Sequence, residues 1–136
     1  MLSENDFFIT GLHYRADSAA VVKAIGLPDS IKEIKQTWRF NHSGFSCWYY
    51  PDYQLYFNPV NSLDGILIQH SGFLTAKGLG VGDSFSRVRE LYGDSSNDVN
   101  FPYASLHYCY NQRDTTGITI RIEDSRVKSI YAGRYN

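Results

Sequence analysis

The chain has 136 residues, of which 43% are apolar and 20% are charged, and these are the proportions of a folded globular domain. With 13 Lys and Arg against 14 Asp and Glu, the chain lacks the excess of positive charge that nucleic-acid binding requires. No uninterrupted apolar run approaches the roughly 20 residues of a membrane-spanning helix. We therefore expect a single domain over residues 1–136, with no nucleic-acid partner and no membrane span.

Two segments, residues 17–26 and 84–93, carry the same helix signature. Each opens with a side chain that can cap free backbone N–H groups, Asp17 in the first segment and Ser84 in the second. Apolar residues then recur along one stripe, and each segment ends in a glycine suited to the left-handed C-terminal position. The sequence therefore predicts two short helices.

Downstream of each predicted helix, apolar and polar residues alternate, which is typical of strands. Polar and turn-forming residues separate the strands that we expect, which are residues 34–40, 47–50, 53–57, 65–68, 106–110, 118–122 and 127–131. The pattern predicts an α+β fold of two tandem repeats, about residues 11–70 and 78–133. Each repeat would be a helix followed by a three- or four-stranded antiparallel sheet, with the helices packed on one sheet face.

The repeat resembles the tandem-repeat fold of the β-lactamase inhibitor proteins and of the SmpA/OmlA lipoproteins of outer-membrane assembly. Residues 82–93 match the Gly-x-Ser to Leu-Gly part of the family repeat, with Tyr in place of its Leu, and residues 21–29 match its Val to Gly-x-Pro part. The aromatic runs 48–50 and 108–110 fall where the family has an aromatic strand. The first copy departs from the pattern, because Arg15-Ala16 stands where the family has a glycine. The resemblance implies a noncatalytic, inhibitor-like protein-binding role in the bacterial envelope, and no inhibitory contact residue carries over.

The 11 tyrosines are more than a core of this size easily hides, because each hydroxyl requires a partner or water. Strand alternation should turn Ile118, Ile120 and Ile122 toward the helices and leave an aromatic-rich sheet face open. We predict that this face binds another protein, because its residue types are those of binding hot spots. The predicted partner-binding residues are Arg39, Trp48, Tyr50, Tyr56 and Arg121. On this prediction, changing Trp48 and Tyr56 to Ala weakens binding and leaves thermal stability nearly unchanged.

Sites for catalysis or metal binding are weaker candidates. Cys47 and Cys109 with His42 and His107 have the ligand types of a zinc site but not its usual compact spacing, so we predict no metal and no cofactor. Two free buried thiols are favoured over a Cys47–Cys109 disulfide. The glycine-rich segment 78–84 lacks the lysine of a P-loop and is predicted to be a structural turn.

Two alternatives to the envelope protein-binding module remain open. One is a small-ligand-binding protein or enzyme with a pocket near His107 and Cys109. The other is a cytosolic immunity-type inhibitor protein. The first residues carry neither the basic nor the apolar region of a signal peptide, and no lipobox cysteine lies near them. The sequence therefore predicts an extracytoplasmic location if the chain is a trimmed mature form, and a cytoplasmic one otherwise.

Overall fold

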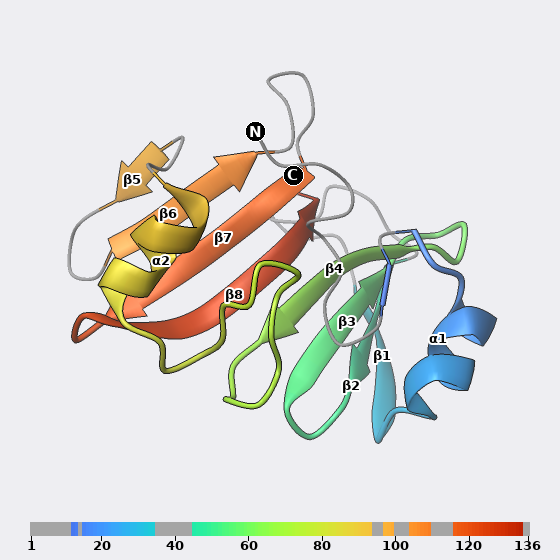
Figure 1. Ribbon diagram of the computed structural model, residues 1–136. Helices are drawn as coiled ribbons and strands as arrows, with labels where there is room; N and C mark the ends of the chain where they lie inside the picture. Colours follow the sequence, from blue (N-terminus) through green and yellow to red (C-terminus); the bar gives the residue numbers. More distant parts are fainter. Residues whose placement is uncertain are drawn as a thin grey trace.

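The computed structural model describes residues 12, 13, 15–34, 45–93, 97–99, 104–109 and 116–134. Within these residues the chain forms two short helices and eight strands (Figure 1). In chain order they are α1 (Ser18–Ile25), β1 (Ser30–Ile34), β2 (Phe45–Tyr49), β3 (Tyr53–Phe57), β4 (Leu63–Ile68), α2 (Phe85–Tyr92), β5 (Asn97–Val99), β6 (Ala104–Cys109), β7 (Thr116–Glu123) and β8 (Arg126–Arg134).

All eight strands belong to one antiparallel sheet, in the order β1-β2-β3-β4-β8-β7-β6-β5. The predicted arrangement of two helix-plus-sheet tandem repeats is therefore wrong. Its physical reason is the pairing of β4 with β8, in which Ile66 lies opposite Ala132 and Ile68 lies opposite Ile130. Because β4 and β8 are hydrogen-bonded to each other, the strands that were expected to form a second sheet continue the first one.

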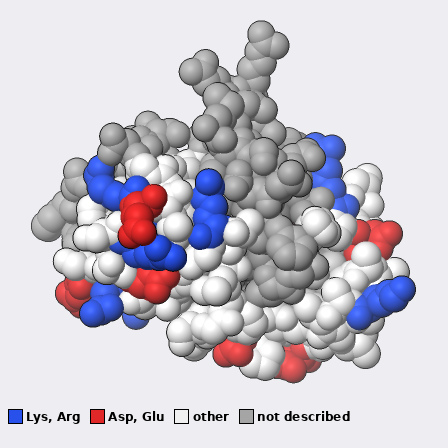
Figure 2. Space-filling model, in the orientation of Figure 1, with Lys and Arg blue, Asp and Glu red and all other residues white. Residues whose placement is uncertain are grey.

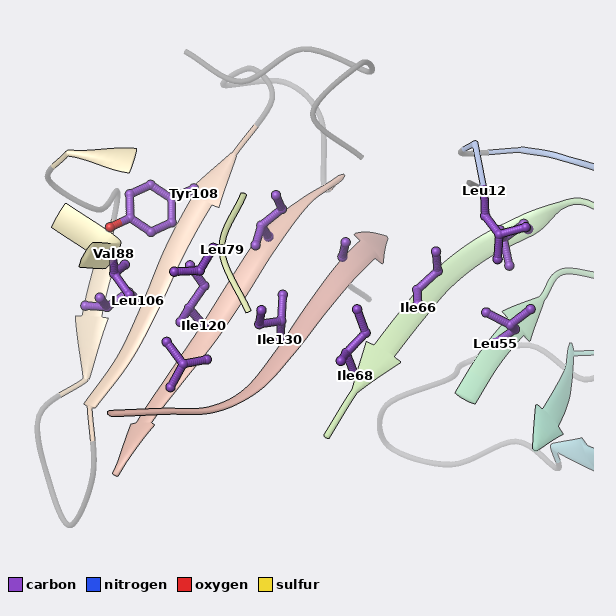
Figure 3. Packing of buried hydrophobic residues seen from close by; sticks show 14 of the residues in the cluster. Leu12, Leu55, Ile66, Ile68, Leu79, Val88, Leu106, Tyr108, Ile120 and Ile130 are labelled. Atoms are coloured by element: carbon purple, nitrogen blue, oxygen red, sulfur yellow. The ribbon is translucent and has the colours of Figure 1, made fainter. Parts of the chain in front are cut away.

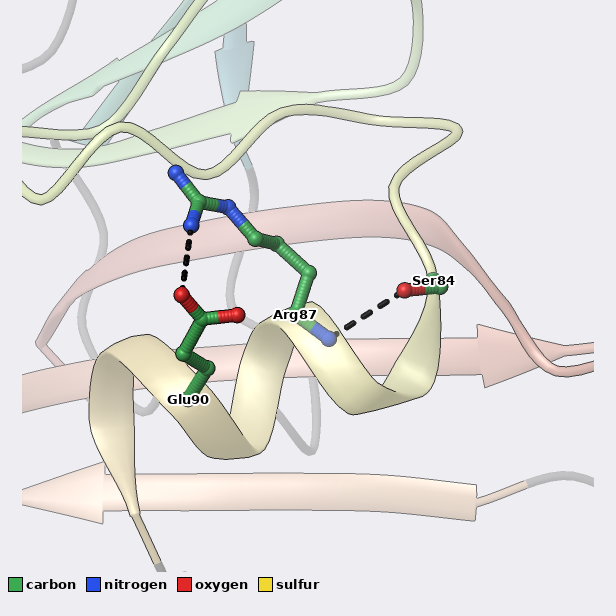
Figure 4. A network of polar contacts seen from close by, with 3 residues as sticks. All are labelled: Ser84, Arg87 and Glu90. Atoms are coloured by element: carbon green, nitrogen blue, oxygen red, sulfur yellow. Dashed lines mark hydrogen bonds and ion pairs between the residues drawn. The ribbon is translucent and has the colours of Figure 1, made fainter.

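Both helices begin and end where the sequence predicts. The Asp17 carboxylate accepts a hydrogen bond from the Ala20 N–H at 2.8 Å, and the Ser84 hydroxyl accepts one from the Arg87 N–H at 3.2 Å (Figure 4). These bonds satisfy backbone donors that a helix start would otherwise leave unpaired. Each helix has 8 residues, and no helix in the described part of the chain is long and apolar enough to cross a membrane.

The strand predictions are most accurate where apolar and polar residues alternate clearly along the chain. The strand predicted over residues 53–57 is β3 as observed. The first strand begins before the predicted start at residue 34, because β1 covers Ser30–Ile34, and residues 35–40 of the prediction lie outside the described residues. The short β5, Asn97–Val99, was not predicted, because three polar-rich residues carry no periodic signal.

One apolar core lies on the side of the sheet that carries the helices. It joins Val21 of α1 and Val88 of α2 to residues from both ends of the sheet. Buried leucine and isoleucine side chains of β3, β4, β6, β7 and β8 project toward this side (Figure 3). Ile118, Ile120 and Ile122 are buried there as predicted.

Candidate protein-binding face

The strand register separates the two faces of the sheet. Leu55 lies opposite Ile66, and Ile66 opposite Ala132, and these three side chains belong to the core. Because successive side chains of a strand point to opposite faces, their neighbours lie on the side away from the core, which we call the outer face. Its described side chains include Lys32, Cys47, Tyr49, Gln54, Tyr56, Leu67, Thr119, Arg121 and Tyr131.

A tyrosine lies across glycines in the middle of the outer face. Gly65 of β4 lies opposite Gly133 of β8. A Cβ atom at Gly65 would lie 2.5 Å from the Tyr131 hydroxyl oxygen, and one at Gly133 would lie 2.9 Å from it. The two glycines therefore leave the space that the Tyr131 ring uses. The Tyr56 ring contacts that of Tyr131 edge-on, with centroids 6.2 Å apart, a geometry that aromatic pairs favour.

Gln54 connects the polar atoms next to this aromatic pair. The Tyr56 hydroxyl donates to Gln54 Oε1 at 3.0 Å, and the Cys47 thiol donates to the same oxygen at 3.9 Å. Cys47 is free and 2% exposed, as predicted for this residue, and burial raises the pKa of its thiol. A raised pKa keeps the thiol protonated, which makes Cys47 a poor nucleophile at neutral pH.

The predicted site residues do not all lie on one face. Tyr56 and Arg121 lie on the outer face, where both are half-buried. Trp48 instead lies in the core, 9% exposed, with its ring 4.5 Å from that of Phe57. Its placement on an open face was wrong because β2 carries apolar residues on both faces, so its sequence pattern does not fix its orientation.

Tyr50 also packs on the core side. It follows the end of β2, stacks on the ring of Tyr53 at 5.0 Å, and its hydroxyl donates to the Gly26 carbonyl at 2.8 Å. Burial raises the pKa of its phenol. Arg39 lies outside the described residues. The structure therefore brings Tyr56 and Arg121 to the same face and separates them from Trp48 and Tyr50.

Tyr49 and Tyr131 were missed as outer-face residues. The signal that could have found Tyr131 is the pair of glycines, Gly65 and Gly133, each inside a strand. An isolated glycine in a strand often marks a close approach by another group. Tyr49 shares the ambiguous pattern of β2, and the ammonium of Lys32 lies 5.4 Å from the centre of its ring.

Most of the candidate catalytic and metal-binding side chains lie outside the described part of the chain. His107 and Cys109 pair through their backbones with Thr119 and Gly117, and their side chains lie outside what the structure describes, as does His42. Among the described residues, no group of three or more His, Cys, Asp and Glu side chains could hold a metal ion. The segment 78–84 forms a turn, in which Asp83 accepts the Gly80 N–H at 2.9 Å.

The solvent side of α2 is polar and carries both charges. Lys and Arg are interspersed with Asp and Glu in this region (Figure 2). The exposed pair of Arg87 and Glu90 lies at 3.1 Å, and a surface pair of this kind contributes little stability. This side of the molecule therefore supplies control positions for tests of the outer face.

Comparison with known proteins gives a fold and no family. No family model and no curated protein matches the chain. An extracellular protein containing a SCP domain from Bacillus anthracis is similar in structure, with a TM-score of 0.61 at 8% identity, over 89% of this chain and 44% of that one. A DUF4309 family protein, YjgB, from Bacillus subtilis has a TM-score of 0.53 at 12% identity, over 88% of this chain and 78% of that one. These likenesses show the fold alone.

The chain spans less than half the length of the Bacillus anthracis protein. Neither structure is named as an enzyme, and neither is named as a β-lactamase inhibitor or SmpA/OmlA protein. This chain has the antiparallel sheet and the α+β character that its sequence predicts, whereas the family resemblance seen in the sequence stays a prediction.

Proposed function

We propose that this protein is a noncatalytic module that binds another protein through the outer face of its sheet. The observation that carries the proposal is the Tyr56–Tyr131 pair, in which the Tyr131 hydroxyl lies against Gly65 and Gly133. Tyrosines bury large contact areas and lose little rotamer entropy on binding, which is why they dominate many binding surfaces. A ring already positioned by close packing loses even less.

The residues around the pair support the same function. Arg121 and Tyr49 lie on the outer face with it, and Arg and Tyr are the residue types most often found at binding hot spots. Gln54 orients the Tyr56 hydroxyl through the 3.0 Å hydrogen bond. The face thus combines apolar ring surface with polar groups at defined positions, which is typical of the centre of a protein interface.

Site-specific photo-cross-linking in the native host tests the proposal. A photoreactive phenylalanine analogue replaces Tyr56 in one variant and Glu90, on the exposed side of α2, in the control variant. The cell envelope and the secreted fraction are the first places to look, because one structural neighbour is named as extracellular.

We expect a dominant covalent adduct with one protein from position 56 and none of that adduct from position 90. Equal adducts from both positions, or no adduct from position 56 in any cell fraction, would contradict the proposal. A fluorescence-based unfolding curve for each variant confirms that both are folded.

A further inference from the structure

The strand β1 forms one edge of the sheet and, among the described residues, pairs with β2 alone. In an antiparallel pair, about half of a strand's backbone N–H and C=O groups point away from its neighbour. An edge of this kind can accept an extended peptide as an additional strand, with backbone hydrogen bonds supplying affinity and side chains supplying specificity.

Apolar side chains are exposed at the start of this edge. Ile31 lies opposite Trp48 on the core side of the sheet, yet its side chain is 55% exposed. Leu27, between α1 and β1, is 78% exposed. An apolar residue directly opposite Ile31 on an added strand would cover it, as cross-strand pairs do within sheets.

The two charged residues of β1 have no charged neighbour directly opposite on β2. Lys32 lies opposite Cys47, and Glu33 lies opposite Ser46. On an added strand, the positions opposite Lys32 and Glu33 would therefore favour an acidic and a basic residue, because opposite charges at facing positions stabilise strand pairs and like charges destabilise them.

We propose that β1 binds an extended segment of another protein as an added antiparallel strand. The bound segment carries a basic residue opposite Glu33, an acidic residue opposite Lys32 and an apolar residue opposite Ile31. Because the added strand is antiparallel, these residues follow one another in that order from its N-terminus to its C-terminus. Lys32 also lies on the outer face, but the inference rests on the edge position of β1 and does not depend on the function proposed above.

A second copy of the chain fits this edge poorly in the three registers centred on the middle residues of β1. Two-fold antiparallel pairing centred on Lys32 would place the two Lys32 residues opposite each other, and pairing centred on Glu33 would oppose the two Glu33 residues. Pairing centred on Ile31 would place Asp29 opposite Glu33 at both ends. Each of these three registers opposes like charges, and the proposal therefore takes the partner to have a different sequence.

The test uses two labelled nine-residue peptides with neutral ends and the same valine- and threonine-rich flanks. The matching peptide has Lys-Glu-Val at its centre, and the control peptide has Glu-Lys-Val. Fluorescence anisotropy measures binding to the wild-type chain and to a doubly charge-reversed variant, Lys32→Glu with Glu33→Lys. Both altered residues are exposed, so the variant should remain folded.

We expect the matching peptide to bind the wild-type chain about tenfold more tightly than the control peptide, with the order reversed for the variant. Hydrogen exchange should slow at β1 backbone amides when the matching peptide is bound. Equal affinities, or no binding of the matching peptide up to about 1 mM, would overturn the inference. Dimerisation through β1 in sedimentation experiments would also overturn it.

Discussion

The hydroxyl of Tyr131 lies against Gly65 of the neighbouring strand, where a Cβ atom would be 2.5 Å from its oxygen. The ring therefore occupies space that exists because residue 65 has no side chain. Through its contact with Tyr56, this arrangement determines the shape of the outer face.

Changing Gly65 or Gly133 to Ala should have different effects. At Gly65 the new methyl group meets the end of the Tyr131 ring, which can move, so we expect the free energy of unfolding to fall by about 1 kcal/mol. At Gly133 it also meets the backbone of Asp64 and Gly65, which cannot move away, and we expect a loss of about 3 kcal/mol. Urea unfolding measures both, and equal losses would contradict this account of the packing.

Changing Trp48 to Ala should destabilise the protein far more than changing Tyr56 to Ala. Trp48 is in the core, and removing such a ring leaves a cavity that costs about 3–5 kcal/mol. Tyr56 is half-buried, and its change to Ala removes the edge-on contact with Tyr131 and the hydrogen bond to Gln54, for which we expect about 1 kcal/mol. This ranking replaces the prediction from sequence, in which neither change affects stability, and denaturant unfolding of both variants checks it.

The buried thiol of Cys47 should make stability fall at alkaline pH. Burial raises its pKa in the folded state, so its contribution is fully present below the unfolded thiol pKa of about 8.5 and is lost as the pH rises through the folded value. We expect Cys47→Ala to be less stable than the wild type at neutral pH but to lose less stability up to about pH 10. Urea unfolding at several pH values measures this, and parallel losses in the two proteins would show that the thiol is not responsible.

The start of α2 offers a test of local stabilisation. Ser84→Ala removes the acceptor for the Arg87 N–H and should cost about 1 kcal/mol. Glu90→Ala removes the exposed ion pair with Arg87 and should change stability by less than about 0.5 kcal/mol. Thermal unfolding compares the two, and a larger effect at Glu90 would contradict the assignment of Ser84 as the cap.

The features that could be predicted from the sequence are those specified by neighbouring residues. Asp17 and Ser84 cap the helices through contacts three residues away. The alternation of Leu55 and Phe57 with Gln54 and Tyr56 is enough to orient β3. The position of Tyr56 on the outer face follows from this local pattern.

The features that could not be predicted depend on residues far apart in the chain. The pairing of Ile66 with Ala132 joins the strands into one sheet, and no local pattern specifies that β4 pairs with β8. Trp48 was placed on the wrong face because Cys47 and Phe45 are also buried, on the opposite face of β2. The position of Tyr131 in the site depends on its contact with Gly65, and these two residues lie on strands that are distant in sequence.

Calorimetric titration of the partner captured at position 56 tests the central claim most directly. The titration compares the wild-type chain with Tyr56→Ala, Tyr131→Ala and the control Glu90→Ala. We predict that each tyrosine change weakens binding by at least about tenfold, the loss typical of a hot-spot residue, and that the control binds as the wild type does. Wild-type affinity in both tyrosine variants would contradict binding through the outer face.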